Sequence, residues 1–528
     1  MKSDRRVPVA IVGGGFSGTM LAAQLARRGI TSVLIEGGGR LGHGIAFSTD
    51  EPAHVLNVRS ESMSAWPDDP DHFARETGDP RGFAQRRHFG RYLRSILDEA
   101  IASGRVEPIA DMAVAAVREA GDWRIDLEDG GGVVARALVL AIGNQPPEPL
   151  NAVPAAAGER FINNPWGGGA RAAVREAAAS GGEVLLIGTG LTMIDTVLSL
   201  AAAGHRGRIV ALSRRGQIPK AHAEFAAAPV EAGELPEGLL ELWRWLRRRS
   251  GEVGWRAAVD SLRPHSHALW QGLSLAEQRR FLRHARPWWD AHRHRIAPEV
   301  ARQIVDMVAG GRLDIVAGRI VGIREIEGAL GVEIRRRGWP LTPLSCAESP
   351  SSSALRCSDV PQTFGAPRPS GGEGLGRFEF VFNCTGPLGA IGRSRDPMLR
   401  RMLDDGLVRP DRLGIGLEVD GRSRAAGAAN LWALGPLTKG RYWEIVAVPD
   451  IRGQAAAVAD DIASLLQPAV RAMREHKSNL PPDLVEGEPP AREALPGETL
   501  NPLPEKDYTQ KQQPFCDGEE NDPEIDGR

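Results

Sequence analysis

Two short stretches of the chain share one design, an apolar strand that runs into a glycine turn and then into a helix. The first is VAIVGGGFSG, residues 9–18, and the second is VLLIGTGLTMID, residues 184–195. Such a turn lets the backbone approach a pyrophosphate at the positive end of the helix. Because one nucleotide needs one such turn, the repetition predicts two nucleotides bound by one chain.

The first stretch carries the complete dinucleotide fingerprint. Gly13, Gly15 and Gly18 follow the pattern GxGxxG between a strand and a helix. The next apolar strand, TSVLIE, ends in Glu36, at the position where a carboxylate can accept hydrogen bonds from a ribose. The order of strand, turn, helix, strand and acid therefore predicts a dinucleotide site at these four residues.

The second stretch departs from the fingerprint at two positions. Gly188 and Gly190 are present, but Met193 stands where the third glycine would be. The following strand ends without an acid, in Ser213, and is followed by Arg214 and Arg215. A carboxylate there would repel the 2′-phosphate of NADP, whereas a guanidinium can bind it with two hydrogen bonds. The arginine pair favours NADP over NAD; the alternative is a pair of solvated surface arginines.

The repetition extends beyond the glycines. The stretch from Gly104 to Gly143 has a counterpart from Gly311 to Gly386, and both alternate like small antiparallel strands before an apolar strand that ends in a glycine. Each half therefore predicts a complete nucleotide-binding domain. The fold class is α/β, with two Rossmann-like dinucleotide-binding domains.

Three further segments lie outside this plan. Residues 226–300 have Trp and Leu at helical spacing and predict a helical insertion. Residues 338–377 are rich in Pro, Ser and Gly and predict a disordered insertion at a hairpin tip. Residues 467–528, rich in Pro and Glu, predict a disordered tail.

Composition excludes several classes of partner. Among 528 residues, 65 Lys and Arg face 67 Asp and Glu, so no field of one sign favours nucleic acid. No apolar run is long enough to span a membrane. The four cysteines form no CxxC pair and no zinc pattern, which fits a reducing cytoplasm. No acidic residue recurs at i+3 or i+4 among the histidines of residues 226–300, so they predict no metal site. Nothing in the sequence indicates the oligomeric state.

Longer stretches carry a resemblance to a known family. The chain resembles, over about residues 7–466, the FAD/NAD(P)-binding family related to class B flavin monooxygenases and to the fold of the pyridine-nucleotide disulfide reductases. The stretches are GIAFSTDEPAHVLNVRSESMSAWPDDPDHF (44–73), SRRGQIPKAH (213–222), RPWWDAHRHRIAP (286–298) and LWALGPLTKGRYWEIVAVPDIRGQA (431–455).

The resemblance implies how the two nucleotides divide the chain. Residues 1–155 and 387–466 would form an FAD domain from both ends of the chain, and residues 156–386 an inserted NADP domain. Gly143 and Gly435 would lie at the FAD, with Gly435 at the turn that passes the ribityl chain. The helix from Pro449 would aim its positive end at the pyrimidine edge of the flavin.

Two departures from the family pattern concern the cofactor and the reaction. Pro436 stands where many relatives have Asp, so Lys439 or Glu444 is expected to replace the ribityl contact. The linker FINNPWGGG (161–169) lacks the histidine of the class B signature. The polar stretch with Asn57, Ser60, Ser62 and Trp66 is expected to line the flavin, or else to be an ordinary loop. The candidates for the flavin face are Asn57, Trp66, Lys439 and Glu444; the catalytic residues themselves are not identified.

Three functions follow from these expectations. The first is a monooxygenase in which NADPH reduces FAD and a peroxyflavin, formed with molecular oxygen, hydroxylates a small molecule. The second is a reductase that passes electrons through FAD to a quinone, a disulfide or a partner protein, although no CxxC pair lies near the flavin segments. The third is a flavin-binding sensor or scaffold without a catalytic function. No feature of the sequence names the substrate.

Overall fold

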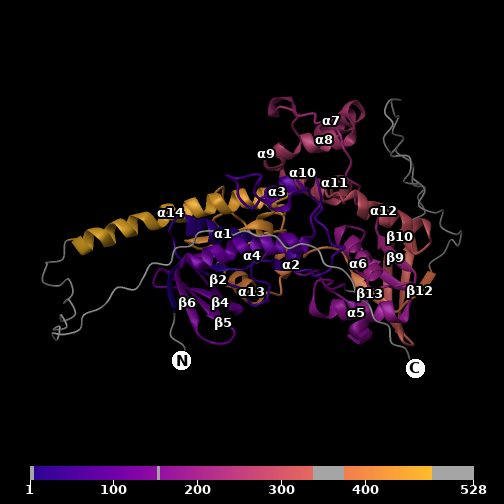
Figure 1. The fold of residues 1–528 in the computed structure, drawn as a ribbon, viewed down its shortest axis with the longest axis horizontal. Helices are drawn as coiled ribbons and strands as arrows, with labels where there is room; N and C mark the ends of the chain where they lie inside the picture. Colours follow the sequence, from indigo (N-terminus) through magenta and orange to yellow (C-terminus); the bar gives the residue numbers. More distant parts are fainter. Residues whose placement is uncertain (1–4, 151–154, 337–373, 479–528) are drawn as a thin grey trace, which may run out of the picture. The chain divides into compact units, whose positions relative to one another are not determined.

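The computed structural model describes residues 5–150, 155–336 and 374–478, and two sheets form its framework. Both sheets lie in one compact unit, Met1–Val470; of the second unit, residues 471–528, only the last residues of one helix are described. Figure 1 shows a group of helices beside each sheet and a third group that belongs to neither.

The first sheet combines strands from both ends of the chain. Five strands run parallel in the order β3-β2-β1-β6-β14, and β5 and β4 continue the sheet beyond β6 as antiparallel strands. The strand β14 comes from the C-terminal part of the chain and pairs with the second half of β6. The strands are β1 (Arg5–Val12), β2 (Ser32–Ile35), β3 (Val106–Ile109), β4 (Ala113–Glu119), β5 (Asp122–Leu127), β6 (Gly132–Leu140) and β14 (Leu431–Ala433).

The second sheet is built from the middle of the chain. Its order is β12-β11-β10-β9-β8-β13-β7, with β10 to β7 parallel and β11 and β12 antiparallel to their neighbours. The first five residues of β10 pair with β9, and the rest of that strand turns away to pair with β11. The strands are β7 (Phe161–Ile162), β8 (Val184–Ile187), β9 (Ile209–Ser213), β10 (Leu313–Ile326), β11 (Ala329–Arg336), β12 (Gly374–Phe378) and β13 (Phe380–Asn383).

The two sheets correspond strand for strand. The order β3-β2-β1-β6 in the first matches β10-β9-β8-β13 in the second, and each carries an antiparallel hairpin layer. Val12 at the end of β1 pairs with Leu140, and Ile187 at the end of β8 pairs with Asn383. The expected α/β fold with two Rossmann-like domains, one of them built from both chain ends, is confirmed.

Helices cover one face of the first sheet, and a hairpin and a short helix cover the other. The helix α4 (Arg86–Ala102) buries Phe89, Leu93 and Ile96, whose spacing of three to four residues places them on one side. These side chains share a core with α1 (Phe16–Arg27) and α14 (Val448–Ser478), and Figure 1 shows α1 and α4 beside the strands β2 to β6. On the opposite face α13 (Pro397–Asp404) packs against β4, its first turn capped by the Asp396 side chain. The remaining short helices of this domain are α2 (Gly44–Phe47), η1 (Ser60–Ser62), α3 (His72–Thr77), η7 (Ile391–Arg393) and η8 (Gly435–Thr438).

The second sheet is covered in the same manner. The helices α5 (Gly168–Ser180), α6 (Leu191–Ala202) and α12 (Pro298–Ala309) share one core with the strands, and the hairpin of β11 and β12 covers the opposite face. The helix α12 starts with a proline at its first position, where no N–H is needed, and a short 3-10 segment, η2 (Ala155–Arg160), precedes β7.

A third group of helices forms the predicted insertion. Their core contains Leu239, Leu246, Trp270 and Trp289 and also receives Trp443 from the C-terminal segment. The indole rings of Trp270 and Trp443 stack with centroids 4.9 Å apart, and the Trp270 indole N–H donates to the carbonyl oxygen of Gly440 over 2.9 Å. The elements are η3 (Ala232–Glu234), α7 (Leu239–Val253), α8 (Trp255–Ser261), η4 (Arg263–His265), α9 (Ser266–Gly272), α10 (Leu275–Arg280), the π-helical turn η5 (Phe281–Ala285) and α11 (Arg286–Arg293).

Two predicted boundaries differ from the structure. Residues 374–377, assigned to the disordered insertion, lie in β12, because their backbone completes the antiparallel ladder with β11. The helix α14 continues to Ser478, past the predicted start of the tail at residue 467. The rest of both predicted segments, with Cys346, Cys357 and Cys516, lies outside the described residues.

Candidate functional site

The first glycine turn lies between β1 and α1. Gly13 has φ +107°, and a Cβ on it would lie 2.4 Å from the carbonyl oxygen of Ala141. A Cβ on Gly18 would lie 1.9 Å from the carbonyl oxygen of Gly13. Gly15 is different: it caps α1 without a side-chain hydrogen bond, and its Cβ would make only an ordinary contact of 3.4 Å with Gly44. Packing therefore requires Gly13 and Gly18, whereas Gly15 leaves the N-terminus of α1 open to a ligand.

Glu36 follows β2 and holds the loops around this turn. One carboxylate oxygen accepts the N–H of Gly14 over 2.7 Å, and the other accepts the N–H of Gly38 over 2.8 Å. Each carboxylate oxygen can accept a second hydrogen bond. The half-buried Glu36 can therefore position the turn and still accept hydrogen bonds from ribose hydroxyls.

The second glycine turn, between β8 and α6, repeats this geometry. Gly188 has φ +118°, and a Cβ on it would lie 2.2 Å from the carbonyl oxygen of Cys384. Gly190 caps α6, and a Cβ there would meet nothing within 4 Å. Met193, which replaces the third glycine, is fully buried in the core of this domain. The turn is thus open at the helix end, as in the first domain.

The strand β9 ends in a neutral hydroxyl where β2 is followed by a carboxylate. The Ser213 hydroxyl accepts the N–H of Gly216 over 3.0 Å and lies 2.8 Å from the Thr189 hydroxyl in the glycine turn. Thr189 also contacts the carbonyl oxygen of Gln217. Ser213 therefore ties the turn to the end of β9 without placing a negative charge there.

The two arginines that follow β9 differ in their contacts. Arg214 is exposed, and within the described ranges it has no hydrogen-bond or ion-pair partner. Arg215 donates to the carbonyl oxygen of His284 over 3.1 Å, so it also holds the helical insertion. Of the pair, Arg214 is the better placed to bind a phosphate.

The C-terminal segment passes over the first turn of α1. Gly435 has φ +62°, and a Cβ on it would lie 2.6 Å from the Ser17 hydroxyl. Its N–H donates to the Gln454 side chain over 2.8 Å, which links this turn to α14. Gly143, with φ +66°, follows β6 with nothing within 4 Å of its Cβ position. Both glycines lie where the strands of the first sheet end, as expected of a nucleotide site.

The candidates Lys439 and Glu444 have different surroundings. Burial, together with the nearby charge of Arg286, lowers the pKa of Lys439 to about 8. Its ammonium group donates to the carbonyl oxygen of Leu388 over 3.3 Å. Glu444 is buried with φ +70°, and its carboxylate accepts hydrogen bonds from the side chains of Trp289 and Arg293. In the structure Glu444 therefore anchors the helix α11 to the C-terminal segment.

The candidates Asn57 and Trp66 also make structural contacts. Trp66 is buried under the guanidinium of Arg27, 3.3 Å from its ring centre, at the end of α1 opposite the glycine turn. The carbonyl oxygen of Asn57 accepts a hydrogen bond from His222 over 3.0 Å, and burial lowers the pKa of His222 to about 4, which keeps its ring neutral. Asn57 thus lies against the second domain. The sequence contains no signal that distinguishes these positions from a flavin-lining loop.

A buried ion pair joins the two domains. The guanidinium of Arg86, in α4, lies 2.9 Å from the carboxylate of Asp195, in α6, and their side chains are 13% and 8% exposed. The same guanidinium donates to the carbonyl oxygen of Val55, and the ring of His54 bonds the carbonyl oxygen of Asp195 over 2.9 Å. Asp195 ends the second glycine stretch, residues 184–195, but nothing in the sequence pairs it with Arg86.

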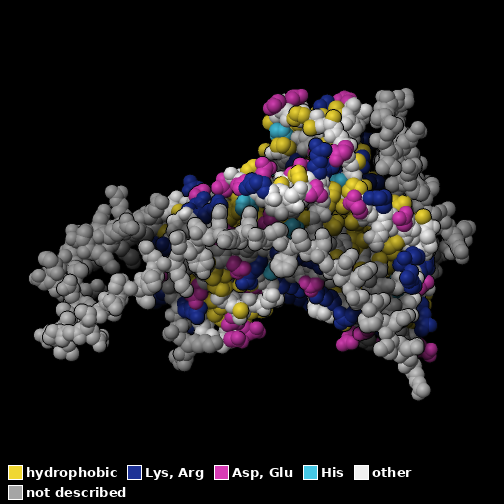
Figure 2. Space-filling view, in the orientation of Figure 1, with side chains coloured by type: hydrophobic (Ala, Val, Ile, Leu, Met, Phe, Trp, Pro, Cys, Tyr) yellow, Lys and Arg dark blue, Asp and Glu magenta, His cyan; other side chains and the backbone are white. Residues whose placement is uncertain are grey.

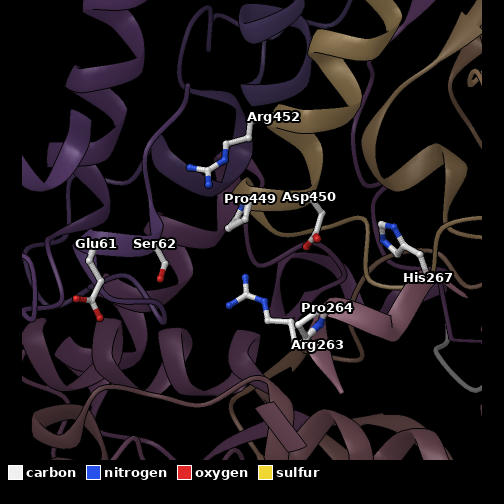
Figure 3. Close-up of a pocket in the computed structure, with 8 residues that line it drawn as sticks. All are labelled: Glu61, Ser62, Arg263, Pro264, His267, Pro449, Asp450 and Arg452. Carbon is white, nitrogen blue, oxygen red and sulfur yellow. The ribbon is translucent and has the colours of Figure 1, made fainter. Parts of the chain in front are cut away.

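A cavity of about 370 Å³ lies where three parts of the chain meet. Glu61 and Ser62 come from η1, Pro449, Asp450 and Arg452 from α14, and Arg263, Pro264 and His267 from the helical insertion. Figure 3 shows the side chains of Arg263 and Asp450 directed into the same space from opposite elements. The cavity adjoins the first turn of α14, the helix expected to aim at the flavin.

Other classes of site find no support in the described ranges. No group of three or more His, Cys, Asp or Glu there could hold a metal ion. No helix in the same ranges combines the length and the apolar character needed to cross a bilayer. Figure 2 shows positive and negative side chains interspersed over the visible face.

Comparisons with known proteins agree with this geometry. Residues 10–145 match the model of an FAD-NAD(P)-binding family. No match was found among curated proteins.

Solved structures of similar fold cover nearly the whole of the framework. The ornithine N-hydroxylase of Kutzneria sp. 744, in a structure with reduced FAD, NADP⁺ and L-ornithine, has a TM-score of 0.56 at 16% identity, over 87% of this chain and 99% of that one. The L-lysine 6-monooxygenase of Pseudomonas syringae has a TM-score of 0.53 at 18% identity, over 88% and 100%. The bacillithiol disulfide reductase of Staphylococcus aureus has a TM-score of 0.50 at 13% identity, over 88% and 99%.

Two nucleotide-binding domains in one compact unit therefore define the class of the protein. The chain has an FAD/NAD(P)-binding oxidoreductase fold, shared by monooxygenases and by disulfide reductases.

Proposed function

We propose that this protein is an FAD-dependent oxidoreductase that uses NADPH, and that it is a monooxygenase acting on a small molecule. The observation that carries the proposal is the pair of glycine turns, each of which leaves the first turn of a helix without a side-chain cap and open to an anion. The few cysteines fit a protein that works in the reducing cytoplasm.

The residues around the two turns support a different nucleotide at each. In the first, Glu36 can accept the ribose hydroxyls of FAD, and Gly435 lets the C-terminal segment approach α1 closely enough to enclose the cofactor. In the second, the neutral Ser213 and the exposed Arg214 favour the 2′-phosphate of NADPH. When bound, these cofactors would supply hydride transfer to the flavin and its reaction with oxygen.

The chain's own residues would orient these groups and exclude water. The Arg86–Asp195 ion pair is a buried contact between the two domains and would help to hold the two nucleotide turns at a constant distance. The insertion packs against residues 440–444 through Trp270 and the anchored Glu444. It thereby covers one side of the cavity next to α14 and would shield a substrate there from solvent on that side.

A disulfide reductase of the same fold is the competing function. Such an enzyme would need reactive cysteines near the flavin, and the sequence has no CxxC pair. Cys384 is 3% exposed, and burial raises its pKa to about 12, so it holds its proton at neutral pH and is a poor nucleophile. These features support the oxygenase over the disulfide reductase.

The deciding experiment follows NADPH oxidation and oxygen uptake in parallel with the purified, flavin-loaded protein. A panel of amines, amino acids, purines and aromatic acids is screened for compounds that increase both rates and yield a product heavier by one oxygen atom. A hydroxylated product supports the proposal. Rapid anaerobic oxidation of NADPH with a quinone or a disulfide, and no oxygenated product with any compound, would contradict it and support a reductase.

A further inference from the structure

The charged cavity beside α14 contains an arginine without a partner. The guanidinium of Arg263 lines this space, and within the described ranges it has neither a hydrogen bond nor an ion pair. Burial lowers the pKa of Arg263, and Arg293 lowers it further, yet an arginine still holds its charge at neutral pH. An unpaired, partly desolvated cation is costly unless a ligand or water satisfies it.

A carboxylate faces the same space and is also unpaired. The side chain of Asp450, in the first turn of α14, forms no hydrogen bond or ion pair with any described residue. Burial raises the pKa of Asp450, whereas the charges of Arg263 and His267 lower it. Arg263 and Asp450 are thus near enough to influence one another but are not in contact. Both line the same cavity, and Figure 3 shows their charged ends apart.

The other charged groups of the cavity balance one another. Arg452 already donates to the carbonyl oxygen of Ser64 over 2.7 Å, and Glu61 lies on the exposed side. The ring of His267 packs against Tyr442, with centroids 5.6 Å apart. Two guanidinium and two carboxylate groups line the cavity, so its charge complements a ligand without net charge and does not favour a phosphate or another multiply charged anion.

We infer that this cavity binds a small zwitterion, a molecule with a carboxylate and an ammonium group, with the carboxylate at Arg263 and the ammonium at Asp450. The volume of about 370 Å³ lies at the lower end of the range of ligand pockets, about 300–1,000 Å³, which fits a free amino acid. The inference rests on the proposed function, because the cavity would then be the substrate site beside the flavin. Arg263 and Asp450 would determine specificity.

The test measures binding separately from turnover. Calorimetry on the oxidised, flavin-loaded protein without NADPH is carried out with glycine, L-norvaline, L-aspartate and L-lysine. The member that binds best is then compared with the amine that lacks its carboxylate and with the acid that lacks its ammonium group. Both analogues are expected to bind at least about tenfold more weakly, because each leaves one charged side chain unpaired.

Variants locate the site. Arg263→Gln and Asp450→Asn are each expected to weaken zwitterion binding at least about tenfold with unchanged flavin content, and Arg263→Lys to restore part of the loss. Arg248→Gln, on the exposed side of α7, is the matched control and should bind normally. Melting temperatures identify any variant that fails to fold. In that case Arg263→Lys and the analogue series still test whether the cavity binds a zwitterion.

Three results would overturn the inference. The first is that no amino acid of the panel binds more tightly than about 10 mM, and the second is that the analogues bind as well as the zwitterion. The third is loss of FAD from folded Arg263→Gln protein, which would assign the cavity to the flavin. If a zwitterion binds but no oxygen is consumed, the proposed function fails while the site stands.

Discussion

Replacement of Gly13 or Gly188 by alanine tests which glycine turn holds which nucleotide. The two residues occupy equivalent positions, with φ +107° and +118°. Gly13 lies beside the carbonyl oxygen of Ala141, just after β6, and Gly188 beside that of Cys384, just after β13. If FAD occupies the first turn and NADPH the second, Gly13→Ala should release the flavin. Gly188→Ala should leave the flavin bound and raise the KM for NADPH.

The magnitude follows from the space around each glycine. A Cβ would lie 2.4 Å from the oxygen of Ala141 at Gly13 and 2.2 Å from that of Cys384 at Gly188, whereas ordinary contacts begin near 3.4 Å. Each carbonyl would have to move by about 1 Å, and alanine at positive φ costs about 1–2 kcal/mol in addition. A turn displaced to this extent should lose about ten- to a hundredfold in nucleotide affinity.

The assay combines the absorbance of the purified variants with NADPH titration. Flavin content is read from the visible spectrum, and thermal melts confirm that both variants fold. Gly29→Ala, with positive φ but nothing within 4 Å of its Cβ position, separates backbone strain from crowding at the turn. Loss of flavin from Gly188→Ala with retention in Gly13→Ala would reverse the assignment, and equal loss in both would mean that the turns do not act separately.

Three further predictions concern the arginines, the domain interface and the insertion. Arg214→Ala should raise the KM for NADPH about ten- to a hundredfold and leave the KM for NADH nearly unchanged. The double variant Arg214→Ala/Arg215→Ala should also loosen the helical insertion, because Arg215 bonds His284. An equal rise in KM for both donors would mean that the two arginines have only a structural role. Asp195→Asn should lower the free energy of unfolding by about 3–5 kcal/mol, measured by chemical denaturation, because it leaves Arg86 buried without a counterion. The control Asp50→Asn breaks the exposed pair with Arg171 and should change this free energy little. Similar effects of the two variants would show that burial does not determine the contribution of an ion pair here. Deletion of residues 338–372, with Asn-Gly placed between Arg337 and Glu373, should keep flavin content and NADPH oxidation within about twofold of the full chain. The matching hairpin of β5 and β6 is joined by residues 128–131 alone, and the free energy of loop closure changes by only about 1–2 kcal/mol. Loss of bound FAD would show that the removed segment contributes to a site.

The parts of the fold that could be predicted from the sequence are those encoded over short distances. A strand, a glycine turn and a helix are adjacent in the chain, and so Gly13, Gly18 and Gly188 could be assigned before their φ angles and contacts were known. The duplication could be recognised because each copy repeats the same order of strands. Such local patterns do not depend on how distant segments meet.

The contacts that could not be predicted join residues far apart in the chain. Arg86 and Asp195 are 109 residues apart, and nothing near either one marks it as half of a buried ion pair. Glu444 follows the glycine turn at a distance that suits a cofactor contact, yet its left-handed backbone turns its carboxylate to Trp289 and Arg293 of the insertion. Which partner a buried charge finds depends on tertiary packing, and spacing does not reveal it.

The helical insertion is therefore the part of this chain most able to determine its specificity. The glycine turns recur in both domains with the same geometry and so can select nucleotides only. The insertion, by contrast, is bonded to the C-terminal segment through the side chains of Trp270, Trp289 and Arg293. It also contributes Arg263 to the cavity beside α14. Arg263 comes from the insertion and Asp450 from the C-terminal segment. A change in the insertion would therefore alter the distance between their two charged groups. Relatives that keep both glycine turns but differ in this insertion should therefore bind the same nucleotides and different substrates.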